Sequence, residues 1–406
     1  YQMRKALEPE LAASLAGKLS DAQLAVLQEL AARYPEPAQS AEEEKEQHIA
    51  SLIFHARLSE FANNRLLGFI IGFMAQILTD LTVYRKLYDP PNAELWRKGR
   101  EHQLQLVDAL RKGDADGAHS QDDWGTPAQN IAELAAGAPR QFAISVCLPD
   151  GSCLSAGAAD KPFSIQSVSK VFALAATLGR IGGQLWSRVG REPSGTSFDS
   201  VVLLEREKGR PRNPFVNAGA IVTTDALLSG REPKQALAEI LGLVRAMGEA
   251  DDVYFNGKVA ASEKATGARN RALAYYLQSH GNLRNDPELT LGTYFHQCAI
   301  EMSTRQLAMA GRSLARLQDA PRILSGQHAR RINALMMTCG HYDGSGEFAY
   351  QAGLPGKSGV GGGILVIAPG VASIAIWSPG LNHYGNSHAG TRAAALLTQA
   401  TGWSVF

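Results

Sequence analysis

The chain has 406 residues, well beyond the roughly 150 typical of one domain, so at least two domains are predicted. Hydrophobic residues make up 45% of it and charged residues 19%, which excludes a largely disordered protein. The formal net charge is +1, so the composition indicates neither a nucleic-acid-binding nor an acidic-membrane-binding surface.

Residues 1–118 have the pattern of successive amphipathic helices and lack strand signals. Apolar side chains recur at helical spacing, as in Leu7, Leu11, Leu15, Leu24, Leu27 and Ala31. Helix-breaking segments fall at residues 34–37, at residues 89–92 and at Gly113. We therefore predict an all-α helical bundle for this half, followed by a linker at residues 119–123.

No membrane-spanning segment is expected. The most apolar stretch, residues 66–79, is shorter than the about 20 residues that a spanning helix needs, so we predict a buried helix there. Residues 358–391 lack Asp, Glu, Lys and Arg, but glycine and proline interrupt them too often for a spanning helix. Since no basic and apolar leader opens the sequence, a cytoplasmic location is expected.

The cysteines are too few and too scattered for a disulfide framework or a zinc ribbon; they are Cys147, Cys153, Cys298 and Cys339. Cys147 and Cys153 flank a turn and could face each other across a hairpin. In a reducing cytosol, free thiols are the favoured state for both.

In residues 124–406 the sequence pattern changes to a mixture of predicted helices and strands interrupted by glycines. Strand signals predict one hairpin at residues 142–147 and 152–156, and a second at residues 363–368 and 372–377. Helices are predicted at residues 167–178, 234–247, 304–317 and 387–401. Helices grouped around an antiparallel sheet make an α+β sandwich.

Ser167 and Lys170, in the stretch FSIQSVSK, lie three residues apart at a predicted helix start, so they share one face. A serine hydroxyl is a poor nucleophile until a base takes its proton, and a lysine kept neutral by burial can be that base. The helix start adds backbone N–H groups near the reacting oxygen. Alone, this spacing also fits an exposed helix face.

A second motif supports the catalytic interpretation of Ser167 and Lys170. It consists of Lys357, Ser358 and Gly359, just before a glycine run and a predicted strand. The order S-x-x-K and then K-S-G is similar to the serine β-lactamase and penicillin-binding architecture. We expect the backbone N–H groups of Ser167 and Val360 to form an oxyanion hole. The glycines could instead mark only a bulge or a close backbone approach.

The N-terminal half resembles the helical effector-binding domain of GntR-type transcription regulators. The resemblance is carried by YQMRKALEPELAASLAGKLS, FHARLSEFANNRLL and VDALRKGDADGA. Since this chain shows no winged helix, no nucleic-acid binding through it is expected.

That family holds a metal with an Asp four residues before the His of its "FH" motif and with two later histidines. Here His55 matches, Ser51 replaces the Asp, and the later positions fall at Gln103, beside His102, and near Gly125. One surviving His cannot supply a metal site, so no metal is expected and His55 is interpreted as a polar group satisfied within the bundle.

The C-terminal half, from about Trp124 to Phe406, closely resembles the serine-dependent glutaminases, which have a β-lactamase-like fold and convert L-glutamine to L-glutamate and ammonia. The motifs occur in the family's order: FSIQSVSK, LWSRVGREPSG, PRNPFVNAGAI, ASEKATGARNRALA, TYFHQCAIEMS, CGHYDGSGEFAYQAGLPGKSGVGGGI and GNSHAGTRA. The resemblance implies an acyl-serine mechanism without cofactor.

Position by position, the resemblance implies that Ser167 is the acylated nucleophile and that Lys170 accepts its proton. Tyr342 would relay protons, and the N–H groups of Ser167 and Val360 would stabilise the oxyanion. The implied substrate-holding positions are Gln166, Asn217, Glu263, Asn270, Tyr294, Tyr342 and Val360. Without the resemblance, the Asn residues fit turns or caps, Tyr294 fits a core aromatic and Glu263 fits a solvated surface.

Three positions depart from the family pattern. Residues 125–134 read GTPAQNIAEL, so Asn130 stands where the family has a substrate-contacting tyrosine, and Ala132 replaces a proline. Losing one hydrogen bond to a charged ligand would weaken transition-state binding by roughly 1.5 to 3 kcal/mol. Asp199 replaces the usual Asn and adds a charge near the site.

Three functions fit these observations. The leading hypothesis is a cytoplasmic glutaminase domain, residues 124–406, fused to a helical ligand-binding domain, residues 1–118, with L-glutamine as substrate. The alternative is a catalytically weakened small-molecule sensor. A β-lactam-binding hydrolase rests on the S-x-x-K and K-S-G skeleton alone. Both resemblances imply a homo-oligomer, and no membrane partner is expected.

Overall fold

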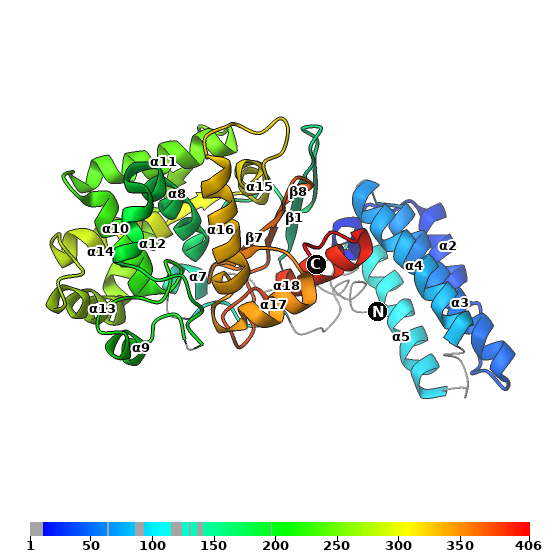
Figure 1. The fold of residues 1–406 in the computed structure, drawn as a ribbon. Coiled ribbons are helices and arrows are strands. Elements are labelled where there is room, and N and C mark those ends of the chain that lie inside the picture. The colour runs from blue at the N-terminus through cyan, green and yellow to red at the C-terminus, as the bar shows by residue number, and fades with distance from the viewer. Residues whose placement is uncertain are drawn as a thin grey trace. The chain divides into compact units, whose positions relative to one another are not determined.

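The structure, a computed structural model, describes residues 11–62, 65–85, 93–114, 124–129, 131–135, 141–195 and 197–406. The chain divides into two compact units, Tyr1–Asp123 and Trp124–Phe406 (Figure 1). The linker expected at residues 119–123 lies outside the described residues.

The first unit is helical, as predicted. Its helices are α2 (Asp21–Ala32), α3 (Ala41–Glu60), α4 (Arg65–Arg85) and α5 (Ala93–Lys112). Ser20 caps α2 in a reciprocal pair with Gln23, and Ser40 accepts a hydrogen bond from the Glu43 backbone N–H to begin α3. Gly113, with φ of +71°, follows the end of α5. Residues 34–37 separate α2 from α3, as expected, whereas residues 89–92 lie outside the described residues.

The apolar positions at helical spacing form the core of this unit. Leu11, Leu15, Leu24, Leu27 and Ala31 are buried, and Leu7 lies outside the described residues. This burial confirms the helical pattern derived from their spacing.

The prediction of a buried helix at residues 66–79 was wrong. Within α4, Ile71 and Ala75 are buried, but Phe69 is 68% exposed and Phe73 42% exposed, and their rings stack on each other. A helix in a small bundle covers only one of its faces against neighbours, and α4 packs mainly on α3. Among the described residues, no helix combines the length and apolarity needed to cross a bilayer.

The second unit is built on a five-stranded antiparallel sheet in the order β2-β1-β8-β7-β6. Its strands are β1 (Ala143–Cys147), β2 (Cys153–Gly157), β6 (Gly356–Ser358), β7 (Gly363–Ala368) and β8 (Ala372–Trp377). Both predicted hairpins are present. The strands β1, β7 and β8 are buried along their whole length, consistent with cover on both faces.

The first hairpin also corrects the expectation of free thiols, because Cys147 and Cys153 form a disulfide. They are direct partners in the β1–β2 register, with Cα atoms 4.1 Å apart. The cross-strand register brings the two thiols within bonding distance, and this geometry overrides the expectation from a reducing compartment. Cys298 and Cys339 are free and buried.

Helices cover the sheet on two sides, which makes the predicted α+β sandwich (Figure 1). Helix α15 (Thr304–Ala315) packs on β1, β7 and β8, and α18 (His388–Thr401) also packs on β7 and β8. Beyond α15 lies a mainly helical region with a small sheet of β3 (Phe163–Ser164), β5 (Ile300–Met302) and β4 (Tyr254–Phe255). The helices of this region are α8 (Ser169–Ile181), α9 (Val201–Arg206), α10 (Asn217–Leu228), α11 (Pro233–Gly248), α12 (Gly257–Thr266), α13 (Ala268–Ser279) and α14 (Pro287–Cys298).

The remaining elements are short or lie beside the sheet. They are α7 (Ala132–Ala135), η1 (Gln166–Val168), η2 (Gly182–Ser187), α16 (Gly326–Cys339), η3 (Tyr342–Gly344) and α17 (Ser345–Ala352). The helices predicted at residues 234–247, 304–317 and 387–401 correspond to α11, α15 and α18.

A buried ion pair ties the helical region together. Asp225, on α10, is fully buried and pairs with Arg188, which follows η2. Its other oxygen accepts hydrogen bonds from the backbone N–H groups of Arg284 and Asn285 and from the Asn285 side chain. Because both oxygens are occupied, the charge is compensated inside the core.

Candidate active site

The sequence FSIQSVSK folds as a strand, a single turn and a helix. The strand β3 ends at Ser164, the 3-10 turn η1 carries Ser167, and α8 begins at Ser169 with Lys170 in its first turn. Ser167 is 7% exposed and therefore lies in a largely desolvated setting. Gln166, just before it, has φ of +48°, a backbone conformation that non-glycine residues rarely adopt.

Lys170 is held as a buried amine. Its Nζ donates hydrogen bonds to the Asn217 side-chain oxygen at 2.7 Å and to the Phe215 carbonyl oxygen at 3.1 Å. Burial lowers the pKa of Lys170 to about 8, although the charges of Cys298, Glu263 and Asp199 act in the opposite direction. The neutral form of this amine therefore becomes substantial as the pH approaches 8, and it lies one helical turn from Ser167.

Three further predicted positions form a connected group with Lys170. Asn217, the first residue of α10, donates from Nδ2 to the Asn270 side-chain oxygen on α13 at 2.9 Å. The Tyr294 hydroxyl on α14 donates to the Asn217 oxygen at 3.3 Å. Three helices thus bring Asn217, Asn270 and Tyr294 together from positions up to 77 residues apart.

Glu263 and Gln166 form a second pair. Glu263, on α12, is 8% exposed, and its Oε1 accepts a hydrogen bond of 3.0 Å from Gln166 Nε2. Gln166 Nε2 also donates to Ser164 Oγ at 2.9 Å. Burial raises the pKa of Glu263 to about 8, while the Gln166 bond and the Lys170 charge lower it. A cationic ligand beside Glu263 would therefore stabilise the ionised carboxylate.

Tyr342 lies against the nucleophile. It forms a hydrogen bond with Ser167, and its hydroxyl lies 3.4 Å from the Ser358 carbonyl oxygen. Its ring is tilted against Phe198 with centroids 4.5 Å apart, and its backbone φ is +57°. Burial raises the pKa of Tyr342, so the phenol stays protonated and can donate or pass on a proton.

The glycine loop after β6 approaches the nucleophile turn closely. A Cβ atom on Gly359 would lie 2.5 Å from the Ile165 carbonyl oxygen and 3.2 Å from the Ser167 nitrogen, and one on Gly361 would overlap the Ser164 carbonyl oxygen. Only glycine fits such an approach. Val360 lies between them, and its N–H makes no hydrogen bond within the described part of the chain. Both candidate oxyanion donors are therefore on facing segments.

Lys357 is a member of the site to which the sequence assigned no role. It is fully buried on β6, its Nζ donates to the Ser358 carbonyl oxygen at 2.5 Å, and it lies 4.7 Å from the centre of the Tyr342 ring. Burial and the Lys170 charge hold the pKa of Lys357 well below its usual range. The K-S-G motif was the available signal, but its spacing does not reveal what the amine contacts.

Two of the departures from the family pattern, Asn130 and Asp199, have different outcomes. Asn130 lies outside the described residues. Asp199 forms an ion pair with Arg269 at 3.2 Å, next to Asn270, and accepts a hydrogen bond from Ser197. The added charge is therefore partly compensated at the edge of the site.

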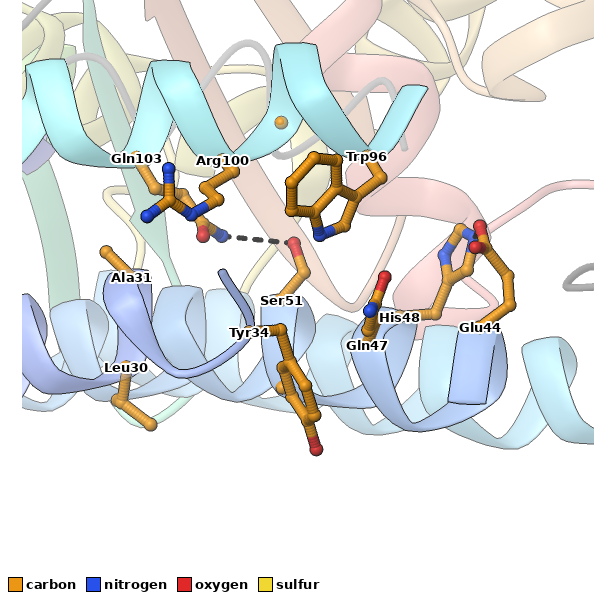
Figure 2. Close-up of a pocket in the computed structure, with 12 residues that line it drawn as sticks. Leu30, Ala31, Tyr34, Glu44, Gln47, His48, Ser51, Trp96, Arg100 and Gln103 are labelled. Atoms are coloured by element: carbon orange, nitrogen blue, oxygen red, sulfur yellow. Dashed lines mark hydrogen bonds and ion pairs between the residues drawn. The ribbon is translucent and has the colours of Figure 1, made fainter. Parts of the chain in front are cut away.

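The described positions that match the metal ligands of the resembling family are Ser51, His55 and Gln103. Gln103 lies within hydrogen-bonding distance of the other two, and Figure 2 shows its bond with Ser51. Gln103 Nε2 donates to Ser51 Oγ at 3.0 Å and lies 3.5 Å from His55 Nε2. His55 is buried in the bundle. Across the residues that the structure describes, no group of three or more His, Cys, Asp or Glu side chains is placed to hold a metal ion.

Comparison with known proteins agrees with this geometry. The Glutaminase family profile matches residues 125–406, and the FCD domain profile matches residues 1–121. A glutaminase of Rhodopseudomonas palustris strain HaA2 is 58% identical over 288 residues, which cover 70% of this chain and 93% of the relative.

Solved structures show the same relationship. The probable glutaminase ybaS has a TM-score of 0.68 at 38% identity and covers 71% of this chain and 94% of its own. A probable glutaminase from Bacillus subtilis, complexed with 6-diazo-5-oxo-L-norleucine, has a TM-score of 0.64 at 32% identity, covering 70% and 91%. The predicted β-lactamase-like fold of the C-terminal unit is thereby confirmed. The chain belongs to the glutaminase family and carries an FCD domain before its glutaminase domain.

Proposed function

We propose that the C-terminal unit hydrolyses L-glutamine to L-glutamate and ammonia through an acyl-serine intermediate. The observation that carries the proposal is the buried Lys170 amine, held by two carbonyl oxygens one turn from Ser167. A neutral lysine in this position acts as the base for a serine nucleophile.

In the proposed first step, Lys170 takes the proton of Ser167 while Oγ attacks the side-chain amide carbon. The N–H groups of Ser167 and Val360 stabilise the tetrahedral oxyanion. The proton that Lys170 took passes through Tyr342 to the amide nitrogen, and the C–N bond breaks to release ammonia and leave Lys170 neutral. Water then attacks the acyl ester, Lys170 accepts a proton from it, and glutamate leaves as Ser167 recovers its proton.

The amino-acid end of the substrate is assigned to two groups of residues. Glu263 accepts hydrogen bonds from the α-ammonium group, and Gln166 keeps the Glu263 carboxylate in place. Asn270 and Tyr294 donate to the α-carboxylate, and Asn217 positions both of them as well as Lys170. An analogue that lacks the α-ammonium or the α-carboxylate group would leave the buried partners of that group unpaired, which is unfavourable. Both groups of the substrate therefore contribute to specificity.

The test is ammonia release from L-glutamine by the full chain and by Ser167→Ala. We expect the substitution to reduce kcat by about 10⁴-fold or more, because the covalent route is lost. The matched control is Ser169→Ala, which removes a hydroxyl two residues away. Treatment with 6-diazo-5-oxo-L-norleucine should add mass at Ser167 in the wild type. Turnover retained in Ser167→Ala would contradict the proposal, and glutamine binding without turnover in the wild type would favour a ligand sensor.

Two further proposals come from the resemblance and concern the whole chain. We expect the protein to be cytoplasmic and to form a homo-oligomer. Fractionation of cells followed by immunodetection tests the location, and light scattering after size-exclusion chromatography tests the assembly. A monomer at micromolar concentration would contradict the second expectation.

A further inference from the structure

The second unit contains a pocket at the end of the five-stranded sheet that is remote from the catalytic centre. It has a volume of about 830 Å³ and lies between the end of α15, the start of α16 and the turn that joins β7 to β8. Val360 precedes β7, whereas Pro369 and Gly370 follow it and line the pocket. The six residues of β7 span about 20 Å, so this pocket is separate from the proposed oxyanion site.

Three arginines line this pocket, which we call the arginine pocket; they are Arg316, Arg322 and Arg330. Their guanidinium groups form no ion pair and no hydrogen bond within the part of the chain that the structure describes. Other arginines of this unit are paired, as Arg212 is with Glu207 at 2.7 Å. Since no Asp or Glu belongs to the described lining, the pocket concentrates positive charge in a chain whose net charge is only +1.

The first turn of α16 holds one of these arginines in place. A Cβ atom on Gly326, the first residue of α16, would overlap the Arg316 guanidinium group, so this group packs directly on the glycine backbone. The backbone N–H groups of Gly326 and Gln327 have no partner among the described residues. A helix start and a guanidinium group each favour an anionic ligand, and in this pocket the two lie together.

A buried hydrogen-bond acceptor belongs to the wall of the same pocket. Asn333, on α16, is 8% exposed and lines the pocket. Its Nδ2 donates to the Leu314 carbonyl oxygen at 3.0 Å, which fixes the orientation of the amide, while its buried Oδ1 has no hydrogen-bond partner. Because a buried acceptor is costly to leave unbonded, the pocket favours a ligand that brings an O–H or N–H donor as well as negative charge.

These two requirements define the chemistry of the ligand. Three guanidinium groups need more than one negative charge, which a single carboxylate lacks and a phosphate monoester supplies near pH 7. The planar guanidinium group also matches phosphate oxygens in a bidentate geometry. The volume of the pocket suits an organic molecule larger than phosphate alone, and a hydroxyl group on that molecule would supply the donor for Asn333 Oδ1.

We propose that the arginine pocket binds a phosphate monoester of a hydroxylated organic molecule. Its phosphate group is bound by Arg316, Arg322 and Arg330 at the start of α16, and one of its hydroxyl groups donates to Asn333 Oδ1. Sugar phosphates and nucleotides share this chemistry. The site is distinct from the residues assigned to glutamine.

Isothermal titration calorimetry on the full chain tests this proposal. The probes are ribose 5-phosphate and AMP, and the matched compounds without phosphate are ribose and adenosine. We expect at least one phosphate ester to bind about tenfold or more tightly than its phosphate-free counterpart, because the charge-assisted bonds are lost with the phosphate. Tighter binding of ribose 5-phosphate would identify a sugar phosphate as the ligand, and tighter binding of AMP would identify a nucleotide. Ethyl phosphate, which has no hydroxyl group on its organic part, should bind more weakly than either.

Four substitutions locate the binding. Arg322→Gln and Arg330→Gln should each weaken it by about tenfold, because each removes one charged partner. Gly326→Ala keeps every charge but displaces the Arg316 guanidinium group, so it should weaken binding by about three- to tenfold. The matched control is Arg206→Gln on α9, which removes an exposed arginine outside the pocket and should leave binding unchanged. Circular dichroism checks that each variant is folded.

Four outcomes would overturn the proposal. They are the absence of binding by both phosphate esters at millimolar concentration, equal binding by ribose and adenosine, equal binding by ethyl phosphate, and unchanged affinity in a folded variant that combines Arg322→Gln with Arg330→Gln. The comparison between probes uses the wild-type sequence alone, so it decides the matter even if a variant fails to fold. Ammonia release does not enter the measurement, so failure here is distinct from failure of the glutaminase assignment.

Discussion

Buried polar groups are bonded differently in the catalytic centre and in the helical pocket, which lies among α2, α3 and α5 of the first unit (Figure 2). In the catalytic centre, Lys170 is bonded to Asn217, and Glu263 is bonded to Gln166. In the helical pocket, oxygen atoms of Glu44 and Gln47 and the Arg100 Nε have no partner. The side chains of Lys170 and Glu263 thus have partners within the protein, whereas these three pocket atoms have none among the described residues.

This difference separates preorganised catalytic groups from groups without partners. A catalytic group must already be oriented when substrate arrives, and bonds such as those of Lys170 supply that orientation without further cost. A buried polar atom without a partner makes no bond that a substitution could break. Substitutions in the two regions should therefore have effects of very different size.

Removal of the base should give the largest effect. Lys170→Met keeps the volume of the side chain but removes the amine, so Ser167 loses its proton acceptor. We expect kcat to fall by about 10³- to 10⁴-fold, with thermal stability unchanged or raised because a buried amine is gone. Ammonia release and differential scanning calorimetry measure the two quantities. A loss below tenfold would mean that another group, such as Lys357, takes the proton.

Two buried carboxylates, one in each unit, provide a matched comparison of stability. Asp225→Asn breaks an ion pair and a set of backbone bonds, so we expect the free energy of unfolding to fall by about 3 to 5 kcal/mol. Glu44→Gln removes a carboxylate with one unbonded oxygen and should change it by less than about 1 kcal/mol. Urea unfolding of the full chain measures both. Equal losses would show that the Glu44 carboxylate is compensated as fully as that of Asp225.

The pH dependence of kcat/KM should show a smaller effect, and it tests the role of Glu263 separately. Activity needs the neutral form of Lys170 and the ionised form of Glu263, and both forms appear as the pH rises through about 8. We therefore expect kcat/KM to rise between pH 6 and pH 9. In Glu263→Gln it should be about 10- to 100-fold lower at pH 9, with a shallower rise, since only one required deprotonation remains. A pH profile of unchanged steepness would exclude Glu263 from the titration.

Local patterns were sufficient for much of the fold. The nearly continuous apolar runs at residues 363–368 and 372–377 identify β7 and β8 with their bounds, because a buried hairpin with a Pro-Gly turn has a clear signal. The spacing of Leu24, Leu27 and Ala31 likewise places them in the core. The partial exposure of α4 and the cross-strand disulfide were not foreseen, because they depend on which neighbour covers a face and on strand register.

The site could be predicted in part. Ser167 and Lys170 share a motif, so their proximity follows from one helical turn, and the remaining positions came from the family resemblance. No local pattern predicts the individual contacts. Examples are the hydrogen bond from Lys170 to the Phe215 carbonyl oxygen and the contact of Lys357 with the Tyr342 ring. Such contacts join segments far apart in sequence and are decided by tertiary packing.

The backbone conformation of Gln166 and Tyr342 has a consequence for how this enzyme loses activity. Both residues hold a left-handed conformation, which costs about 1 to 3 kcal/mol each and persists only while surrounding bonds enforce it. Relaxing either residue would release that energy and turn Ser167 or its hydroxyl partner out of line. The catalytic geometry therefore depends on two strained backbone positions. On mild heating, activity should be lost at a lower temperature than the one at which the five-stranded sheet unfolds.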